Sequence, residues 1–125
     1  MARPALLEVL RKRVLLCDGG MGSRVQILPL DIEKDYWGKE NCTDVLCLSR
    51  PDIVRDIHRG YYEAGADMVL TNSFGGSPIT LAEFEIGDRA FELCKASGEL
   101  AREAAESFAD GRDRWVIGDI GPGTK

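Results

Sequence analysis

The sequence predicts an α/β fold with a parallel sheet. Three short apolar segments, residues 14–17, 66–70 and 115–118, each end at a glycine-containing turn. A continuous apolar run followed by turn residues is typical of a strand that is buried on both faces, as in a parallel sheet. Helical patterns separate the three segments, and strands that alternate with helices favour right-handed βαβ units.

The first part of the chain carries two short helical patterns around the first strand. Residues 5–12 are amphipathic and precede the strand, and residues 21–28 follow its glycine turn. Residues 29–49 show no regular pattern and are expected to form a long irregular loop. Loops of this length inside a compact domain are usually functional or disordered.

A longer helix is predicted from Pro51 to about residue 64. Proline suits the first helical turn, and Gly65 is the expected C-terminal cap. The apolar positions recur at helical spacing: Ile53, Val54, Ile57, Tyr61 and Ala64. We therefore expect one face of this helix to pack on the sheet.

Two further helices are predicted between the second and third strands. Ser77 is a candidate N-cap of a short one, and Asp88 a candidate N-cap of a long one over residues 89–109. The long helix has one face of apolar and small residues: Phe91, Cys94, Gly98, Ala101, Ala105 and Phe108. That face is expected to be buried.

Composition limits the classes of function. The chain has 125 residues, 44% of them hydrophobic, which suits one domain with a modest core. Its formal net charge is -5, and its basic residues are dispersed among acidic ones. Because no basic stripe is present to neutralise phosphates, a nucleic-acid partner is not expected.

The cysteines and the N-terminus indicate a cytoplasmic location. Cys17, Cys42, Cys47 and Cys94 show no CxxC spacing, so we expect free, buried thiols rather than a disulfide framework or a metal site made from them. The N-terminus has no signal-peptide core, and no stretch is long and apolar enough to span a membrane. His58, the single histidine, is expected to have a surface or packing role.

The first candidate site is the turn after the first strand. Ligands of parallel α/β folds bind at the carboxyl ends of the strands, where residues 18–23, 71–76 and 119–122 should converge. Backbone N–H groups of the DGGMGS turn suit an anionic group, and Asp18 suits an amine, so together they could bind an amino-acid zwitterion. The alternative is a tight strand-to-helix turn that Asp18 caps.

The other two turns add candidate contacts for a small molecule. Thr71, Asn72 and Phe74 could line a pocket, or could serve only in capping and packing, and the same alternatives hold for Asp119 and Gly121. The glycine spacing matches neither the dinucleotide fingerprint nor the P-loop. The residues alone therefore indicate a small-molecule site above a partial parallel sheet.

Taken with their flanks, the turns resemble a known family. The segments are LLCDGGMGSRVQ, DVLCLSRPDIVRDIHRGYYEAGADMVLTNSFGGS and WVIGDIGPGTK. They closely resemble the homocysteine S-methyltransferase family, most of all the N-terminal homocysteine-binding module of cobalamin-dependent methionine synthases. The likeness runs in order from about Val14 to Gly123.

The resemblance implies a (β/α)8 barrel that transfers a methyl group to the thiol of homocysteine and so makes methionine. Residues 1–125 would form roughly its first three βα units, an incomplete domain. In the family, zinc held by cysteine thiolates lowers the pKa of the homocysteine thiol. The methyl donor could be methylcobalamin, a methylated sulfonium compound or betaine.

The resemblance also assigns roles to the turn residues. Asp18 would bind the homocysteine amine, Gly19 and Gly20 would offer backbone contacts, and Thr71, Asn72 and Phe74 would line the pocket. Asp119 and Gly121 match the end of the third strand less specifically. The family's zinc ligands lie in later strands, in a Gly-Gly-Cys-Cys type of motif that none of the four cysteines matches. No metal ligand is therefore expected in this chain.

Three functions stay open at this point. The first is a fragment of a homocysteine S-methyltransferase, inactive alone and paired with a complementing chain that carries the rest of the barrel. The second is a corrinoid-linked methyltransferase of the same fold. The third is a small-molecule-binding or interaction module without catalysis.

Overall fold

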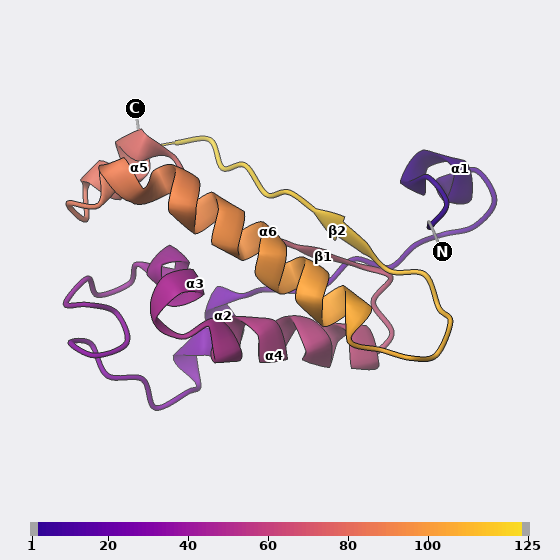
Figure 1. The fold of residues 1–125 in the computed structure, drawn as a ribbon, viewed down its shortest axis with the longest axis horizontal. Helices are drawn as coiled ribbons and strands as arrows, with labels where there is room; N and C mark the ends of the chain where they lie inside the picture. Colours follow the sequence, from indigo (N-terminus) through magenta and orange to yellow (C-terminus); the bar gives the residue numbers. More distant parts are fainter. Residues whose placement is uncertain (1–2, 124–125) are drawn as a thin grey trace.

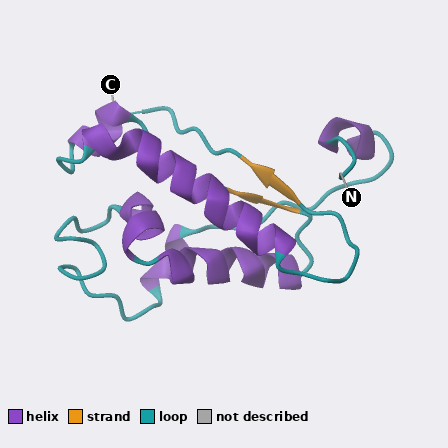
Figure 2. Cartoon of the chain, viewed as in Figure 1, coloured by secondary structure: helices purple, strands orange, loops and turns teal. Residues whose placement is uncertain are grey.

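The computed structural model describes residues 3–123. The predicted domain of residues 1–125 also includes Met1, Ala2, Thr124 and Lys125, which lie outside the described residues. Short helices and two short strands make up the fold, as Figure 2 shows. The helical elements are α1 (Leu6–Leu10), α2 (Gly22–Gln26), the 3-10 turn η1 (Thr43–Val45), α3 (Leu46–Ser49), α4 (Pro51–Glu63), α5 (Pro78–Ala82), the 3-10 turn η2 (Gly87–Arg89) and α6 (Ala90–Glu106). The strands are β1 (Met68–Leu70) and β2 (Trp115–Ile117).

The sheet is parallel, as predicted. β1 and β2 pair in register from Met68 opposite Trp115 to Leu70 opposite Ile117. The first predicted strand, residues 14–17, is not a strand in this structure: it makes one parallel bridge, from Cys17 to Met68. Residues 14–17 nevertheless lie next to β1 and parallel to it, as predicted. Strand pairing stops there because the N–H group of Leu16 is bonded to the side chain of Asp67 instead of to a neighbouring strand.

The helices cover one face of the sheet. α4 and α6 lie side by side along the molecule, on the same side of β1 and β2 (Figure 1). Val69 of β1 is fully buried in a cluster with Tyr62 of α4 and Ala101 of α6. Leu70 follows Val69, and Leu16 follows the buried Leu15, so both point to the other face of the sheet. They are 37% and 59% exposed. The described residues thus leave the second sheet face uncovered.

The segment before α4 is more regular than predicted. Residues 43–49 form η1 and α3, where the sequence indicated an irregular loop. Val45, Leu46 and Cys47 are buried in the larger core cluster, together with Val54 and Leu93. Burial of three consecutive apolar side chains is a tertiary effect, which local periodicity does not report.

The buried face of α6 differs from the predicted one. Phe91 is 82% exposed and Cys94 is also exposed, whereas Leu93, Ser97 and Leu100 face the core. Ala101 and Ala105 are buried as expected. The face is rotated so that Leu93 and Leu100 pack in the larger core cluster, while Phe91 lies at the start of the helix, outside that cluster.

The predicted caps have mixed outcomes. Ser77 caps α5, since its Oγ accepts a bond from the N–H of Thr80 at 3.1 Å. Gly65 follows α4 with a φ of +116°, a conformation that glycine adopts without strain. Asp88 does not cap α6, because the turn η2 leads directly into that helix and Arg89 takes the N-cap position.

Two of the thiols are not buried, contrary to expectation. All four cysteines are free; Cys42 and Cys47 are buried, but Cys17 and Cys94 are exposed. His58 is fully buried in α4, and neither of its ring nitrogens has a hydrogen-bond partner among the described residues. None of the helices in residues 3–123 has the length and hydropathy to cross a bilayer.

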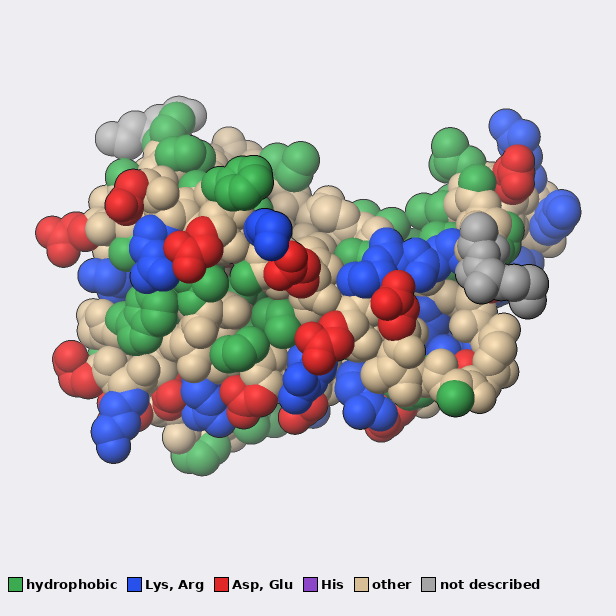
Figure 3. Space-filling model, in the orientation of Figure 1, with side chains coloured by type: hydrophobic (Ala, Val, Ile, Leu, Met, Phe, Trp, Pro, Cys, Tyr) green, Lys and Arg blue, Asp and Glu red, His purple; other side chains and the backbone are tan. Residues whose placement is uncertain are grey.

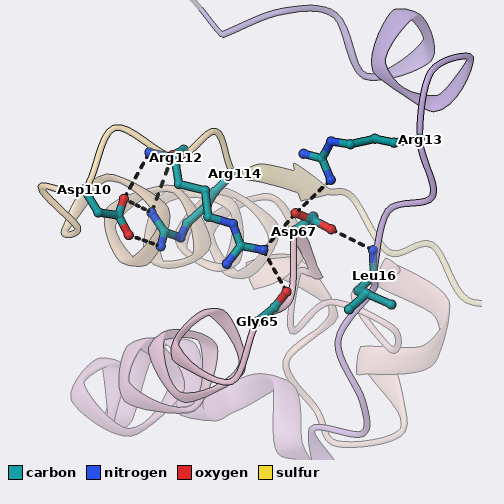
Figure 4. Close-up of polar contacts among 7 residues, drawn as sticks. All are labelled: Arg13, Leu16, Gly65, Asp67, Asp110, Arg112 and Arg114. Carbon is teal, nitrogen blue, oxygen red and sulfur yellow. Dashed lines mark hydrogen bonds and ion pairs between the residues drawn. The ribbon is translucent and has the colours of Figure 1, made fainter.

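Asp67 holds the amino-terminal ends of the strands together (Figure 4). Asp67 is buried, with 3% of the residue exposed. It accepts bonds from the N–H of Leu16 at 2.9 Å and from Arg112 at 2.9 Å, and it also pairs with Arg13 at 3.5 Å. Burial raises the pKa of Asp67, but these donors outweigh it and the net shift is downward. One carboxylate therefore joins three separate segments at the end of the sheet opposite the predicted site.

Candidate functional site

The turns that follow the three parallel segments converge, as the sequence predicted. The N–H of Asp119 donates to Thr71 Oγ1 at 2.9 Å, and Ser73 Oγ donates to the carbonyl of Asp119 at 2.8 Å. The N–H of Leu70 donates to Asp18 Oδ1 at 3.2 Å. These three bonds connect the turns after residue 17, after β1 and after β2 at the carboxyl end of the sheet.

Asp18 supplies an anionic group without a counter-ion. Burial raises its pKa, the hydrogen bonds from Leu70 and Cys17 oppose that shift, and the charge of Asp119 adds to it. Within residues 3–123, no lysine or arginine forms an ion pair with Asp18 or Asp119. Two neighbouring carboxylates with no cation favour a positively charged ligand.

The Asp-Gly-Gly turn offers its backbone beside this carboxylate. Gly19 and Gly20 are exposed, and none of the hydrogen bonds among the described residues uses their N–H groups. The carbonyl of Gly20 accepts a bond from the hydroxyl of Tyr61 at 2.7 Å. A Cβ atom at Gly19 would lie 3.0 Å from that same hydroxyl, so glycine fits there with little room for another residue. Tyr61 of α4 thus holds the backbone of this turn in place.

Thr71 lies inside the site, whereas the side chain of Asn72 bonds to a segment outside it. Thr71 is buried and shares its hydroxyl between Ser73 and the N–H of Asp119. The amide of Asn72 is also buried, but it donates to the carbonyl of Thr43 at 3.0 Å. Asn72 therefore joins the turn after β1 to the segment before α3.

Phe74 and Gly121 meet across the second and third turns. A Cβ atom at Gly121 would overlap the carbonyl oxygen of Phe74, so only glycine allows this approach. The Phe74 side chain is 64% exposed. A cavity of about 90 Å³ lies between these turns, bordered also by Ser73, Cys94 and Asp119. Ligand pockets commonly measure about 300–1,000 Å³, so the described residues build only part of a pocket.

Sequence reasoning missed Asp44. It lies in η1, and its Oδ1 accepts a bond from the N–H of Gly75 at 3.2 Å. Burial raises the pKa of Asp44, the Gly75 N–H opposes the shift, and the charge of Asp119 adds to it. Residues 41–44, within the predicted loop of residues 29–49, gave no periodic signal, so only the folded chain brings this carboxylate to the turn after β1. Tyr61 was recognised as an apolar helix position, but its bond to Gly20 was not foreseen.

The cysteines near the site are held as thiols. Burial and the adjacent Asp18 raise the pKa of Cys17, burial raises that of Cys94, and burial raises that of Cys47 to about 12. Since the thiolate is the form that binds metals and attacks electrophiles, these side chains are unreactive near neutral pH. The described residues contain no group of three His, Cys, Asp or Glu side chains arranged to hold a metal ion. The zinc that the resemblance implies therefore has no matching ligand set here.

Comparison with known proteins gives one consistent family. The family model for homocysteine S-methyltransferase matches residues 15–125. The methionine synthases of Mycobacterium tuberculosis and Mycobacterium leprae are 42% and 40% identical to this chain over 121 residues. These alignments cover 96% of this chain and 10% of each synthase.

Solved structures of the homocysteine methyltransferase MmuM from Escherichia coli have the same arrangement of elements. The oxidised form gives a TM-score of 0.76 at 26% identity and covers 93% of this chain. The metallated form gives 0.73 at 27% identity and covers 94%. The chain spans 40% and 41% of those structures, and a tenth of the length of the synthases.

Proposed function

The chain belongs to the homocysteine S-methyltransferase family, and from this premise we propose that it forms the amino-acid-binding part of an enzyme that methylates homocysteine to methionine. The observation that carries the proposal is the carboxylate of Asp18, which accepts a bond from Leu70 but has no cationic partner among the described residues, beside the free N–H groups of Gly19 and Gly20. A carboxylate and backbone donors on one turn match the ammonium and carboxylate of an amino acid.

Each predicted site residue has a role in this proposal. Asp18 binds the ammonium group, and Asp119 adds negative potential. Gly19 and Gly20 donate N–H groups to the substrate carboxylate. Thr71 keeps the second and third turns in register through its bond to Asp119. Asn72 supports the pocket wall through Thr43, while Phe74 and Gly121 border the side on which the substrate thiol would extend.

We further propose that residues 1–125 are the first three βα units of a (β/α)8 barrel and act with a polypeptide that carries the other units. A barrel of this kind has eight strands and about 250 residues. Support comes from the parallel order of residue 17, β1 and β2, with the helices on one face. On this proposal the chain alone does not catalyse methyl transfer.

The proposal assigns neither zinc nor the methyl donor to the described residues. Zinc would need cysteine thiolates, and the four thiols here are protonated and form no cluster. Methylcobalamin, as the resemblance suggests, would be bound by other parts of the enzyme. The free state of all four cysteines is consistent with a reducing cytoplasm, where we place the enzyme.

The test is calorimetric binding of homocysteine to the complete barrel, assembled from this chain and the remaining units, with and without Asp18→Asn. A charge-assisted hydrogen bond contributes about 1.5–3 kcal/mol, so the substitution should weaken binding about 10- to 100-fold. Asp113→Asn is the matched control, because Asp113 is exposed at the opposite end of β2.

A second ligand separates a local effect from misfolding. 4-Mercaptobutanoate has the thiol and carboxylate of homocysteine but no amine, so its affinity should be the same for both proteins. Equal loss of both ligands would mean that Asp18 only maintains the turn. Unchanged homocysteine affinity in the variant would remove Asp18 from the site and, with it, the proposed orientation of the substrate.

A further inference from the structure

The hydroxyl of Tyr61 contacts both glycines of the Asp-Gly-Gly turn. It donates to the carbonyl of Gly20 at 2.7 Å. A Cβ atom on Gly19 would lie 3.0 Å from the hydroxyl oxygen and 3.2 Å from the ring carbon Cε1, so the ring edge also rests against the backbone of Gly19. Among the described hydrogen bonds, no other side chain bonds to the main chain of residues 18–20.

The C-terminal cap of α4 fixes the main chain at Tyr61. The N–H of Ala66 donates to the carbonyl of Tyr61 at 3.0 Å, and the N–H of Gly65 donates to the carbonyl of Tyr62 at 3.1 Å. These two bonds, with the positive φ of Gly65, form the Schellman arrangement that closes a helix. Helical side chains lean toward the helix N-terminus, and the segment that precedes α4 bonds to the turn after β1. The ring of Tyr61 is therefore directed toward the candidate site.

The bond to Gly20 sets the orientation of one peptide group in the turn. In a trans peptide, the C=O group and the N–H group that follows it point in opposite directions. Since the carbonyl of Gly20 points toward Tyr61, the N–H of Met21 points away from it, and no described hydrogen bond uses that N–H. Two consecutive glycines restrict the main chain little by themselves. The Tyr61 hydroxyl therefore decides which way the N–H groups of this turn face.

The neighbouring Tyr62 makes an equivalent bond in a different place. Its hydroxyl donates to the carbonyl of Trp115 at 2.7 Å, at the amino end of β2. Tyr62 is buried, and it packs with Val69 and Ala101 in the smaller core cluster. α4 thus presents two adjacent tyrosine hydroxyls with equal bond lengths, one on the turn of the candidate site and one at the opposite end of the sheet.

We propose that Tyr61 is a positioning residue that sets the preference of the site for the carboxylate of its substrate. The inference rests on the proposed function, in which N–H groups of the turn bind that carboxylate and Asp18 binds the amine. Donors that are already oriented before the ligand arrives need no further ordering when they bind an anion, so the complex is tighter. The hydroxyl acts through the main chain of Gly20 and not by contact with the substrate.

The experiment measures the calorimetric binding of two ligands to the complete barrel, with and without Tyr61→Phe, which removes the hydroxyl and keeps the ring. The ligands are homocysteine and its decarboxylated analogue, an aminopropanethiol that retains the amine and the thiol. Homocysteine affinity should fall about three- to tenfold, the contribution of one hydrogen bond. Affinity for the aminopropanethiol should be unchanged, because that ligand has no carboxylate for the N–H groups to bind.

Tyr62→Phe supplies the comparison, since it removes an equally bonded hydroxyl from the next position of the same helix. It should lower the midpoint of urea unfolding, because the carbonyl of the buried Trp115 loses its donor. The ratio of the two affinities should stay as in the unmodified barrel.

The outcomes separate this inference from the proposed function. Unchanged homocysteine affinity in Tyr61→Phe would overturn the inference, and so would an equal loss of both ligands, which would give the hydroxyl a general structural role. An effect of Asp18→Asn without an effect of Tyr61→Phe would reject the inference and keep the proposed function. An unmodified barrel that binds neither ligand would reject both.

Discussion

At the scale of single residues, His58 is a buried polar side chain without a partner. Both ring nitrogens lie in the interface of α4 with the core and make no hydrogen bond among the described residues. Burial lowers the pKa of His58 from 6.5 to about 4. The ring is therefore neutral in the folded protein, and its protonation requires unfolding or rearrangement of the helix packing.

This predicts a pH dependence of stability. Below pH 6.5 the unfolded chain binds a proton at His58 that the folded chain does not, so the free energy of unfolding falls between about pH 6.5 and pH 4 and is constant at this site above that window. The full difference is about 3 kcal/mol. Chemical denaturation at pH 7.5 and pH 5 should show about 2 kcal/mol of this difference, because pH 5 lies about 1.5 units below the unfolded pKa.

His58→Leu is the control, because leucine has a similar volume and no polar atoms. The variant should be at least as stable as the parent at pH 7.5 and should lose the slope above pH 5. Asp67 titrates below this window because its pKa is lowered, and Asp18 and Asp44, whose pKa values are raised, contribute equally to parent and variant, so the difference between the two slopes belongs to His58. A parent and a variant with the same slope would show that His58 is hydrated in solution.

At the scale of elements, the sheet is held at two ends by different means. The carboxyl ends are joined by the turn contacts of Thr71, Ser73 and Asp119, and the amino ends by Asp67. The Asp67 carboxylate connects the segment before residue 17, β1 and the loop before β2 (Figure 4). Short strands with few ladder bonds depend on such side-chain connections.

Replacement of Asp67 by Asn should lower the free energy of unfolding by about 2 kcal/mol, because a buried acceptor loses its charge toward two arginines and can no longer serve all its donors. Thermal and urea unfolding measure the change. Glu99→Gln is the comparison, since Glu99 is an exposed ion-pair partner of Lys95 on α6 and such pairs contribute little. An Asp67 effect no larger than that of Glu99 would mean that Leu16 and β1 hold together without the carboxylate.

The sequence predicted the elements better than their contacts. Parallel pairing, the long helices and the convergence of the turns followed from short apolar runs with glycines after them. The buried face of α6 did not, because Leu93 and Leu100 face the core in place of Phe91 and Cys94. The first strand was overestimated, because the N–H group of Leu16 bonds to the side chain of Asp67 in place of a neighbouring strand.

The candidate site, too, was predicted only in part. Asp18, Thr71 and Asp119 were expected to meet because each follows a parallel segment, and hydrogen bonds connect their turns. Asp44 and Tyr61 reach the site from η1 and α4, and their positions depend on packing between elements that are distant in sequence. No local pattern carries that information.

At the scale of the whole molecule, the helices present a charged surface to solvent, and the opposite face of the sheet is uncovered. On the face in Figure 3, acidic and basic side chains are interspersed over α4 and α6, as on an ordinary solvated surface. The sheet face opposite these helices has exposed leucines at positions 16 and 70, and β2 is a strand edge. Exposed apolar patches and strand edges promote association.

We expect the isolated chain to self-associate through this sheet face. The double substitution Leu16→Gln and Leu70→Gln should lower the rate of aggregate growth about threefold or more, because it removes apolar area from the uncovered face. Static light scattering at several concentrations measures it. Leu7→Gln on α1 is the control, as Leu7 is 71% exposed and α1 stands apart from the sheet. If all three proteins aggregate alike, the open face is not the contact.

Tyr61 connects the Asp-Gly-Gly turn to a groove of about 620 Å³ beside α4, which Leu28 and Ile57 also line. Its ring lines the groove, and its hydroxyl holds the carbonyl of Gly20. A helix that packs on the ring restricts the hydroxyl, and a substrate that tightens the turn restricts the ring. Free-energy coupling between two ligands is equal in both directions. On the proposed function, the factor by which assembly of the barrel changes the affinity for the amino acid must equal the factor by which the amino acid changes the affinity of assembly, so substrate binding and folding would report on each other.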